Sequence, residues 1–249
     1  MNKIEKLKEI INNSKMVVFF GGAGVSTASG IPDFRSANGL YNEKGYIVRP
    51  EEILSHHFFL SNTKDFYEFY RTKMVYKDAK PNYAHKYLAK LGQRKDVTII
   101  TQNIDGLHTV AGSTKVIEFH GSTQRNTCMD CGEKYTLEDV LAQEGTPHCK
   151  RCGGIIKPDV VLFEEGIDYQ AIHDSVYATE HADLLIVIGS SLVVYPAAGI
   201  PNYFHGENIA IINRDPTQLD RYAKVVIHDD IKKVFEQLYW VILSKTYLA

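Results

Sequence analysis

The chain has 249 residues, of which 44% are hydrophobic and 23% charged, with 28 lysines and arginines against 30 aspartates and glutamates. This composition excludes wholesale disorder, which requires low hydrophobicity and a high net charge. The formal charge of −2 also excludes the basic field that drives non-specific binding to nucleic acid. Because no apolar run reaches transmembrane length and residues 1–15 lack a signal-peptide core, we expect a cytoplasmic protein with no membrane partner.

Helix and strand patterns alternate along most of the chain. Helical periodicity marks residues 4–13, 84–91, 169–179 and 231–243. Short continuous apolar runs, typical of strands covered on both faces, occupy residues 16–20, 97–101, 116–119, 160–163, 184–188, 209–212 and 224–227. We therefore expect an α/β fold with a Rossmann-like, largely parallel sheet and helices on both of its faces.

Two segments interrupt this alternation. Residues 36–80 are rich in aromatic side chains and predict short helices, whereas residues 122–157 contain all the cysteines. We expect these segments to pack together as a smaller helical and zinc-ribbon lobe. This lobe would be inserted into a Rossmann-like domain formed by residues 1–35, 81–121 and 158–249.

The four cysteines follow the pattern C-x2-C-x17-C-x2-C, at Cys128, Cys131, Cys149 and Cys152. Two such pairs bring four thiolates onto one ion, which is the ligand set of a tetrahedral zinc site. A disulfide framework does not suit a chain without an export signal. Because four thiolates leave no position for water, we expect one structural Zn²⁺. His148 is the less favoured alternative ligand, since the cysteines suffice.

A glycine-rich turn, GGAGVST, follows the first predicted strand at residues 21–27. Glycines between a strand and a helix let the backbone approach a pyrophosphate, whose charge the helix N-terminus stabilises. The match to G-x-G-x-x-G is incomplete because Thr27 stands where the third glycine belongs. A turn with a purely structural role therefore stays open as the alternative.

Polar residues follow four further predicted strands. They are Gln102, Asn103 and Asp105; His120; Gly189, Ser190 and Ser191; and Asn213. Ligands of open α/β sheets bind at the carboxyl ends of the strands, and histidine suits general-base catalysis near neutral pH. Asn103 or Asp105 would also suit capping of a helix that begins near Gly106, so this alternative stays open. Together these positions predict a nucleotide-binding cleft beside His120.

These motifs, in their order along residues 15–235, closely resemble those of the sirtuin family of bacterial type, the NAD-dependent protein deacylases. The matching motifs are GAGVS at 22–26, GIPDFR at 30–35, QNID at 102–105, HG at 120–121, the cysteines, KPDVVLF at 157–163, GSSL at 189–192 and Asn213. The resemblance implies a monomeric enzyme that transfers the acyl group of an acyl-lysine protein or peptide to ADP-ribose. NAD would be the co-substrate, and nicotinamide would be released.

The resemblance also implies the NAD pocket. His120 would be the general base on a ribose hydroxyl, Asn103 a second catalytic residue, and Phe34 a lid that excludes water. Gln102 would contact the nicotinamide ribose, and Asp105 the nicotinamide carboxamide. The remaining residues implied on this side of the pocket are Gly22, Ala23, Gly24, Ser26, Thr27, Asp33, Arg35 and Ile104.

The rest of the implied site lies later in the chain. Gly189, Ser190, Ser191 and Asn213 would bind the adenosine half of NAD, with Asp230 and Ile231 beside the adenine. The implied edge for the acyl-lysine peptide, which would add as a strand, consists of Val160, Val161 and Phe163.

Three positions depart from the family pattern. Glu164 stands where members commonly have the glycine of F-G-E, at the peptide edge. Desuccinylating members carry Tyr-x-x-Arg, whereas here Tyr67 is followed at that spacing by Tyr70, with Arg71 one residue later. We therefore expect a preference for neutral acyl groups such as acetyl, with another acyl group as the alternative. Arg214 is expected to face solvent rather than a cofactor phosphate.

Two other functions stay open at this point. A protein ADP-ribosyltransferase would use the same NAD site, but the presence of His120 disfavours it, because transfer to a protein nucleophile has less need of this base. A non-catalytic zinc-ribbon adaptor or nucleic-acid binder is disfavoured by the near-neutral charge and by the intact set of polar residues at the strand ends.

Overall fold

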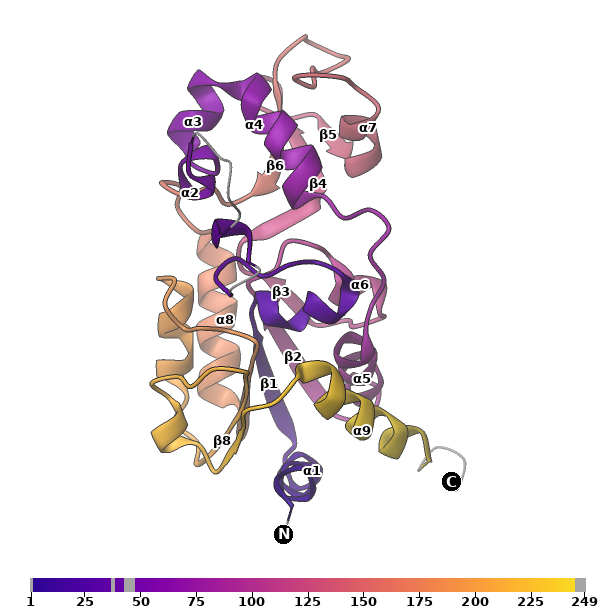
Figure 1. The fold of residues 1–249 in the computed structure, drawn as a ribbon, viewed down its shortest axis with the longest axis vertical. Coiled ribbons are helices and arrows are strands. Elements are labelled where there is room, and N and C mark those ends of the chain that lie inside the picture. The colour runs from indigo at the N-terminus through magenta and orange to yellow at the C-terminus, as the bar shows by residue number, and fades with distance from the viewer. Residues whose placement is uncertain (1, 37–38, 43–47, 245–249) are drawn as a thin grey trace.

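The computed structural model of the protein describes residues 2–36, 39–42 and 48–244. Its larger part is a six-stranded parallel sheet in the order β3-β2-β1-β7-β8-β9 (Figure 1). The strands are β1 (Met16–Gly21), β2 (Asp96–Thr101), β3 (Val116–Glu118), β7 (Leu184–Ile188), β8 (Asn208–Ile212) and β9 (Val225–Ile227). The predicted α/β fold with a parallel sheet is confirmed.

Helices cover both faces of this sheet. One face carries α1 (Lys3–Asn13), α5 (Tyr83–Gly92) and α9 (Ile231–Ser244), and the other carries α8 (Tyr169–His181) and a 3-10 segment, Ala197–Tyr203. Successive side chains of a strand point to opposite faces, so Phe19 packs with the first group and Phe20 with the second. Burial on both faces explains why these strands are continuous apolar runs in the sequence.

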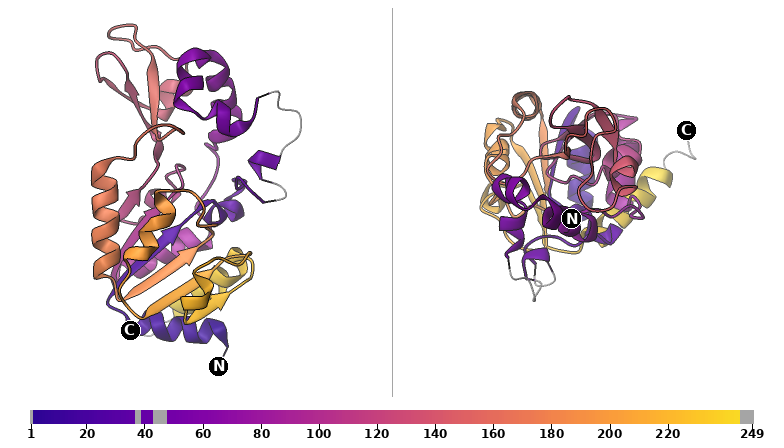
Figure 2. Two further views of the ribbon diagram at one scale, coloured as in Figure 1. Left: turned by 90° about the vertical axis from the view of Figure 1, so that its left-hand side faces the viewer. Right: turned by 90° about the horizontal axis from the view of Figure 1, so that it is seen from above.

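A smaller antiparallel sheet, in the order β5-β4-β6, lies at one end of the large sheet, beside a group of short helices (Figures 1 and 2). The elements are β4 (Gly121–Cys128), β5 (Lys134–Thr136), β6 (Ile156–Val160), α2 (Pro50–Ile53), α3 (His56–Ser61), α4 (Thr63–Phe69) and α7 (Leu137–Leu141). Aromatic side chains of the helices share one apolar cluster with Cys128 and Ile156 of the sheet. Residues from the aromatic and the cysteine-containing segments therefore pack together.

The strand predicted at residues 160–163 is wrong in its position. The strand β6 spans Ile156–Val160 and pairs with β4 in the small sheet, not with the parallel sheet. Its buried residues alternate with the partly exposed Lys157 and Asp159, as expected for a sheet with one buried face. The apolar run that follows lies outside the strand, so apolarity alone marked the wrong residues.

The α-helix expected after the glycine-rich turn is also absent from the described structure. Two 3-10 turns, Ala23–Val25 and Thr27–Ser29, occupy this place. The second turn ends at Gly30, whose φ of 85° is in the left-handed region. Gly30 thus stops the chain from continuing as a helix, and Pro32 follows closely. Among the described residues, no helix has the length and apolarity needed to cross a bilayer.

Two histidines are buried where α5 meets α6 (Leu107–Val110). The rings of His85 and His108 lie 4.6 Å apart between centroids. Burial lowers the pKa of His108 to about 4, and burial together with the neighbouring His108 lowers that of His85 to about 2. Both imidazoles are therefore neutral in the folded protein at pH 7.

This pair predicts a pH dependence of stability. An unfolded histidine has a pKa of about 6.5, so below that pH the unfolded chain binds more protons than the folded chain. The contribution of neutral His108 is fully present above about pH 6.5 and is lost as the pH falls towards 4. Between pH 6 and 5, the free energy of unfolding measured in urea should fall less steeply with falling pH in His108→Gln than in the wild type. The two slopes should differ by about 1 kcal/mol per pH unit.

The matched control is His173→Gln, because His173 is exposed on α8. This variant should keep the wild-type slope. An unchanged slope in His108→Gln would contradict the assignment of a buried neutral histidine.

Candidate active site

Two turns at the carboxyl ends of β1 and β7 pack backbone against backbone. The Gly24 N–H donates to the carbonyl oxygen of Gly189 at 3.0 Å. A Cβ on Gly22 would lie 2.7 Å from that oxygen, and a Cβ on Gly24 would lie 2.8 Å from the Gly189 Cα. Gly189 has a φ of 57°, in the left-handed region. The close approach of the two backbones therefore explains why glycine occupies these positions. The packed turns hold the ends of two adjacent strands next to each other.

Asp105 and Asn103, which follow β2, both reach Ser26 in the glycine-rich turn. The Ser26 hydroxyl donates to Asp105 Oδ2 at 2.6 Å, and Asn103 Nδ2 donates to Ser26 Oγ at 3.0 Å. Asp105 Oδ1 also accepts the N–H of Leu107, the first residue of α6, at 2.8 Å, although the N-cap of this helix is Gly106. Burial raises the pKa of Asp105, and the hydrogen bonds from Ser26 and Leu107 offset this only in part.

His120 lies after β3, between the two sheets. Its Nδ1 is 3.0 Å from the carbonyl oxygen of Gln102, which can only accept, so Nδ1 carries the hydrogen. Its own carbonyl oxygen accepts the Val161 N–H at 2.9 Å. Burial lowers the pKa of His120, and the bond to Gln102 offsets this only in part. The imidazole is thus neutral at pH 7, with the lone pair on Nε2.

A second polar group joins β2, β7 and β8. Gln102 Nε2 donates to Ser190 Oγ at 2.9 Å. Asn213 binds both backbone groups of Ser190: its Oδ1 accepts the N–H at 3.0 Å, and its Nδ2 donates to the carbonyl oxygen at 2.6 Å. Ser190 and Asn213 are both buried. Residues that the sequence placed at three strand ends are thus directly connected.

A cleft of about 290 Å³ lies beside the glycine-rich turn and is lined by Thr27, Gly30, Ile31, Pro32, Asp33, Ser36 and Arg214. Asp33 shapes this loop, because its Oδ1 accepts the N–H groups of Arg35 at 3.0 Å and Ser36 at 2.7 Å. Arg214 is exposed, as expected, yet it also lines the cleft. Arg214 directly follows Asn213 at the end of β8, and this position in the sequence indicates that it lies near the cleft.

The other predicted residues are more dispersed. Phe34 packs against Tyr41 with centroids 5.3 Å apart, and Arg35 lies over the same ring. The Ile104 carbonyl oxygen accepts the Thr123 N–H at 2.9 Å. Ala23 lies in the first 3-10 turn, Ser191 is exposed after β7, Asp230 precedes α9, and Ile231 is buried at its start.

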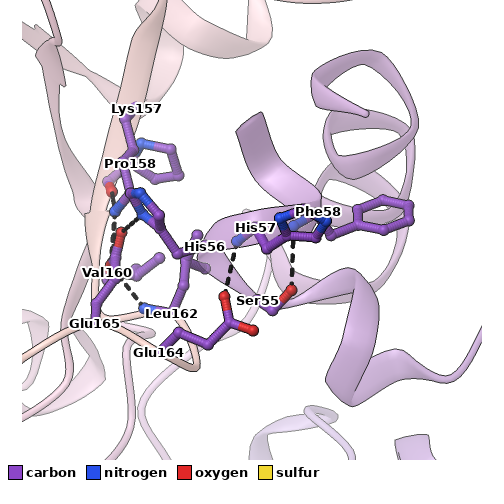
Figure 3. Close-up of polar contacts among 10 residues, drawn as sticks. All are labelled: Ser55, His56, His57, Phe58, Lys157, Pro158, Val160, Leu162, Glu164 and Glu165. Atoms are coloured by element: carbon purple, nitrogen blue, oxygen red, sulfur yellow. Dashed lines mark hydrogen bonds and ion pairs between the residues drawn. The ribbon is translucent and has the colours of Figure 1, made fainter. Parts of the chain in front are cut away.

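The segment after β6 is bound to the short helices (Figure 3). The Phe163 N–H donates to the Leu54 carbonyl oxygen at 3.0 Å, and the Phe163 carbonyl oxygen accepts the His56 N–H at 2.9 Å. Val160 ends β6, the edge strand of its sheet, and Val161 follows beside His120. The Phe163 side chain is nonetheless 41% exposed. This edge is thus fixed at its backbone and apolar at its surface.

Two glutamates hold this segment in place (Figure 3). Glu165 accepts from His56 Nδ1 at 2.7 Å, Lys157 Nζ at 3.0 Å and the Leu162 N–H at 2.9 Å. Glu164 has a φ of 76°, the left-handed conformation that favours glycine, and its Oε2 accepts the His57 N–H at 2.9 Å. Glu164 thus keeps the backbone shape of a glycine and adds a bond to α3.

The sulfur atoms of the four cysteines all lie within 4.8 Å of one another, at Cys128, Cys131, Cys149 and Cys152. None of these cysteines is in a disulfide. Zinc–sulfur bonds of about 2.3 Å in a tetrahedron place sulfurs about 3.8 Å apart. The sulfur–sulfur distances of 3.4 Å between Cys128 and Cys152 and of 3.6 Å between Cys131 and Cys149 are close to this value. Gly132 and Gly153 supply the left-handed turns after each pair. The donor set fits one zinc ion.

Comparison with known proteins identifies the family. The sequence profile of the Sir2 family matches residues 22–196. A protein from Clostridium acetobutylicum named NAD-dependent protein deacetylase is 56% identical over 95% of this chain and 98% of its own length. A protein of the same name from Cutibacterium acnes is 48% identical over 92% of this chain and 94% of its own length.

Solved Sir2 structures have the same fold. One contains a deacetylated p53 peptide and 3'-O-acetyl ADP-ribose; it is 37% identical, with a TM-score of 0.88, and the match covers 96% of this chain and 98% of that chain. Another, of Sir2 with p53 peptide and NAD⁺, is 35% identical with a TM-score of 0.84, and both chains are covered completely. From the agreement of profile, relatives and structures over nearly its whole length, this chain belongs to the Sir2 family.

Proposed function

We propose that this protein is an NAD-dependent protein-lysine deacetylase. The observation that carries the proposal is His120, a buried neutral imidazole bonded through its side chain to Gln102 and through its backbone to Val161. It therefore lies between the polar strand ends and the segment after β6. When bound, NAD supplies the ADP-ribose that accepts the acyl group as nicotinamide leaves.

The glycine-rich turn would hold the pyrophosphate of NAD. Its backbone comes close to β7 because Gly22 and Gly24 have no side chain, and backbone N–H groups in such turns bind phosphate oxygens. Asp33, Thr27 and Arg214 line the adjoining cleft. Arg214 supplies the positive charge there that a phosphate would meet.

The nicotinamide end would lie at the group formed by Ser26, Asn103 and Asp105. This group is partly buried and combines hydroxyl, amide and carboxyl groups within hydrogen-bond distance of one another, which suits a carboxamide. Gln102 and Ile104 would complete this end. Phe34 and Arg35, placed on Tyr41, would exclude water from it.

His120 would act on a ribose hydroxyl through Nε2. Because the Gln102 carbonyl oxygen fixes the hydrogen on Nδ1, Nε2 is left to accept the proton. Burial lowers the pKa of His120, which keeps the base neutral at physiological pH. Asn103 would orient the same ribose.

The adenosine end and the peptide edge would lie on opposite sides of His120. Ser190, Ser191 and Asn213 would bind the adenosine, with Asp230 and Ile231 beside the adenine. The acyl-lysine peptide would lie along the segment of Val160, Val161 and Phe163, of which Phe163 is exposed.

A neutral acyl group is the substrate that the aromatic cluster favours. The Tyr67 hydroxyl donates to the Ile156 carbonyl oxygen. Arg71 lies over the Tyr67 ring at 5.1 Å, and its Nη2 donates to the Gln143 carbonyl oxygen at 2.8 Å. The polar groups of Tyr67 and Arg71 thus already have partners within the small lobe. We therefore do not expect them to bind the carboxylate of an acidic acyl group.

The zinc ion would be structural, held by the four cysteines without a water ligand. Thiolates kept in this way fit a reducing compartment, so we place the protein in the cytoplasm. We also propose that it acts as a monomer, since the groups assigned above all come from one chain.

The first test is catalysis by the wild type and by His120→Ala. An acetyl-lysine peptide should release nicotinamide only when NAD is present. His120→Ala should lower this rate at least about 100-fold, because general-base catalysis contributes that much, while calorimetry still detects NAD binding. His181→Ala, which changes an exposed histidine at the end of α8, should keep the wild-type rate. Deacetylation without NAD would refute the proposal.

The second test concerns the acyl group. With one peptide sequence carrying acetyl-, propionyl- or succinyl-lysine, we expect kcat/KM for the succinyl form to be at least about tenfold below that for acetyl. The reason is that the Arg71 guanidinium is already bonded to the Gln143 carbonyl oxygen and lies over the Tyr67 ring. Equal or faster turnover of the succinyl peptide would contradict this preference.

The third test concerns the metal. Cys128→Ala should lose the bound zinc, measured by elemental analysis, and lower the melting temperature by about 10 °C or more, since structural zinc contributes folding free energy. Met129→Ala, at an exposed neighbouring position, should change neither quantity. If Cys128→Ala melts like the wild type yet is inactive, the zinc is not structural.

A further inference from the structure

Asn213 is the residue of the proposed adenosine site that the structure fixes most completely. Its side chain binds both backbone groups of Ser190, at 3.0 Å and 2.6 Å. Its own N–H donates to the Ile227 carbonyl oxygen at 3.1 Å. Its carbonyl oxygen meets a third partner, the histidine that follows β9. The orientation of Asn213 therefore depends on what holds this histidine.

That histidine, His228, joins Asn213 to a carboxylate. Its Nδ1 lies 3.1 Å from the Asn213 carbonyl oxygen, and its Nε2 lies 2.8 Å from Asp220 Oδ2. Both partners are acceptors, so each ring nitrogen faces a group to which an N–H can donate. The side chains are only partly exposed, 34% for His228 and 21% for Asp220.

Asp220 is anchored in turn by Thr217. Its Oδ1 accepts the Thr217 N–H at 3.0 Å and the Thr217 hydroxyl at 2.7 Å. Burial acts to raise the pKa of Asp220, but the hydrogen bonds from Thr217 and the charge of His228 outweigh it and lower the pKa. The carboxylate is thus ionised and closes the loop of residues 213–220. This loop also carries Arg214, which lines the cleft.

The same chain of hydrogen bonds continues into the catalytic centre. Ser190 Oγ accepts from Gln102 Nε2 at 2.9 Å, and the Gln102 carbonyl oxygen accepts from His120 Nδ1 at 3.0 Å. Polar contacts therefore run without a break from Asp220 to His120. Asp220 and His228 form the outer end of this series, and they are the members to which the proposed function assigns no role.

We propose that Asp220 and His228 are positioning residues for the ADP-ribose part of NAD. They hold the loop that presents Asn213 and Arg214 to the cleft, and they act through these two residues. This inference rests on the proposed function only for the identity of the ligand. Since the pair lies at the far end from His120, its removal weakens binding and leaves the chemical step largely unchanged.

The test measures the affinity for NAD and for ADP-ribose by calorimetry. Asp220→Ala is expected to raise both dissociation constants by the same factor, about fivefold or more, because a hydrogen bond to a charged group is lost. ADP-ribose is the informative probe, since it lacks nicotinamide. In steady state, KM for NAD should rise by this factor while kcat stays within about twofold.

Asp220→Asn serves as the conservative rescue. Its side-chain oxygen can still accept from Thr217, and its amide can donate to His228 Nε2, which leaves Nδ1–H on the Asn213 carbonyl oxygen. We expect NAD affinity within about twofold of the wild type. The matched control is Asp174→Ala, because Asp174 also pairs with a histidine, His173, at 3.2 Å on the surface of α8. It should bind NAD like the wild type.

A folded Asp220→Ala with wild-type affinity for both ligands would overturn the proposal, as would a loss of NAD affinity without loss of ADP-ribose affinity. If circular dichroism shows that Asp220→Ala is unfolded, His228→Asn and His228→Ala take its place. The asparagine amide can keep the bond to Asn213, so His228→Asn must bind NAD more tightly than His228→Ala, and equal affinities would overturn the proposal. A wild type that binds NAD without deacetylating any peptide would refute the proposed function alone.

Discussion

The site depends on the close contact between the backbones of the turns after β1 and β7. Gly22, Gly24 and Gly189 permit an approach that any side chain would block. Because the strands are parallel, their carboxyl ends meet at the same edge, and this contact holds the turns after β1 and β7 together there. The polar residues that follow β2 and β8 can then reach across and form one connected group.

His120 connects this polar group to the small sheet. Its side chain is held by Gln102, from the large sheet, and its carbonyl oxygen holds Val161, just after the small sheet. One residue is therefore bonded both to a polar strand end and to the segment that follows β6. A neutral, oriented imidazole at such a junction is what the proposed proton transfer requires.

Much of this arrangement was predictable from the sequence, because continuous apolar runs mark strands buried on both faces and cysteine spacing marks a metal site. The strand that contains Phe19 and Phe20 was found in this way, because its two faces pack into different apolar clusters. The strand at Ile156–Val160 was misplaced, since it alternates polar and apolar residues in a sheet with one buried face. The sequence marked Arg214 and Glu164 as departures but gave neither the cleft that Arg214 lines nor the bond from Glu164 to His57, because both depend on loop conformation and on partners distant in the sequence.

The strand β4 connects His120 to the cysteine cluster. It begins at Gly121, directly after His120, and ends at Cys128, the first sulfur ligand. Eight residues of extended chain span roughly 25 Å, and β4 pairs with β5 on one side and β6 on the other. An oxidant that attacked the thiolates would therefore loosen one end of a strand whose other end follows His120, the proposed catalytic base. Under the proposed function, the deacetylation rate would then fall when these cysteines are oxidised, although they take no part in the chemical step.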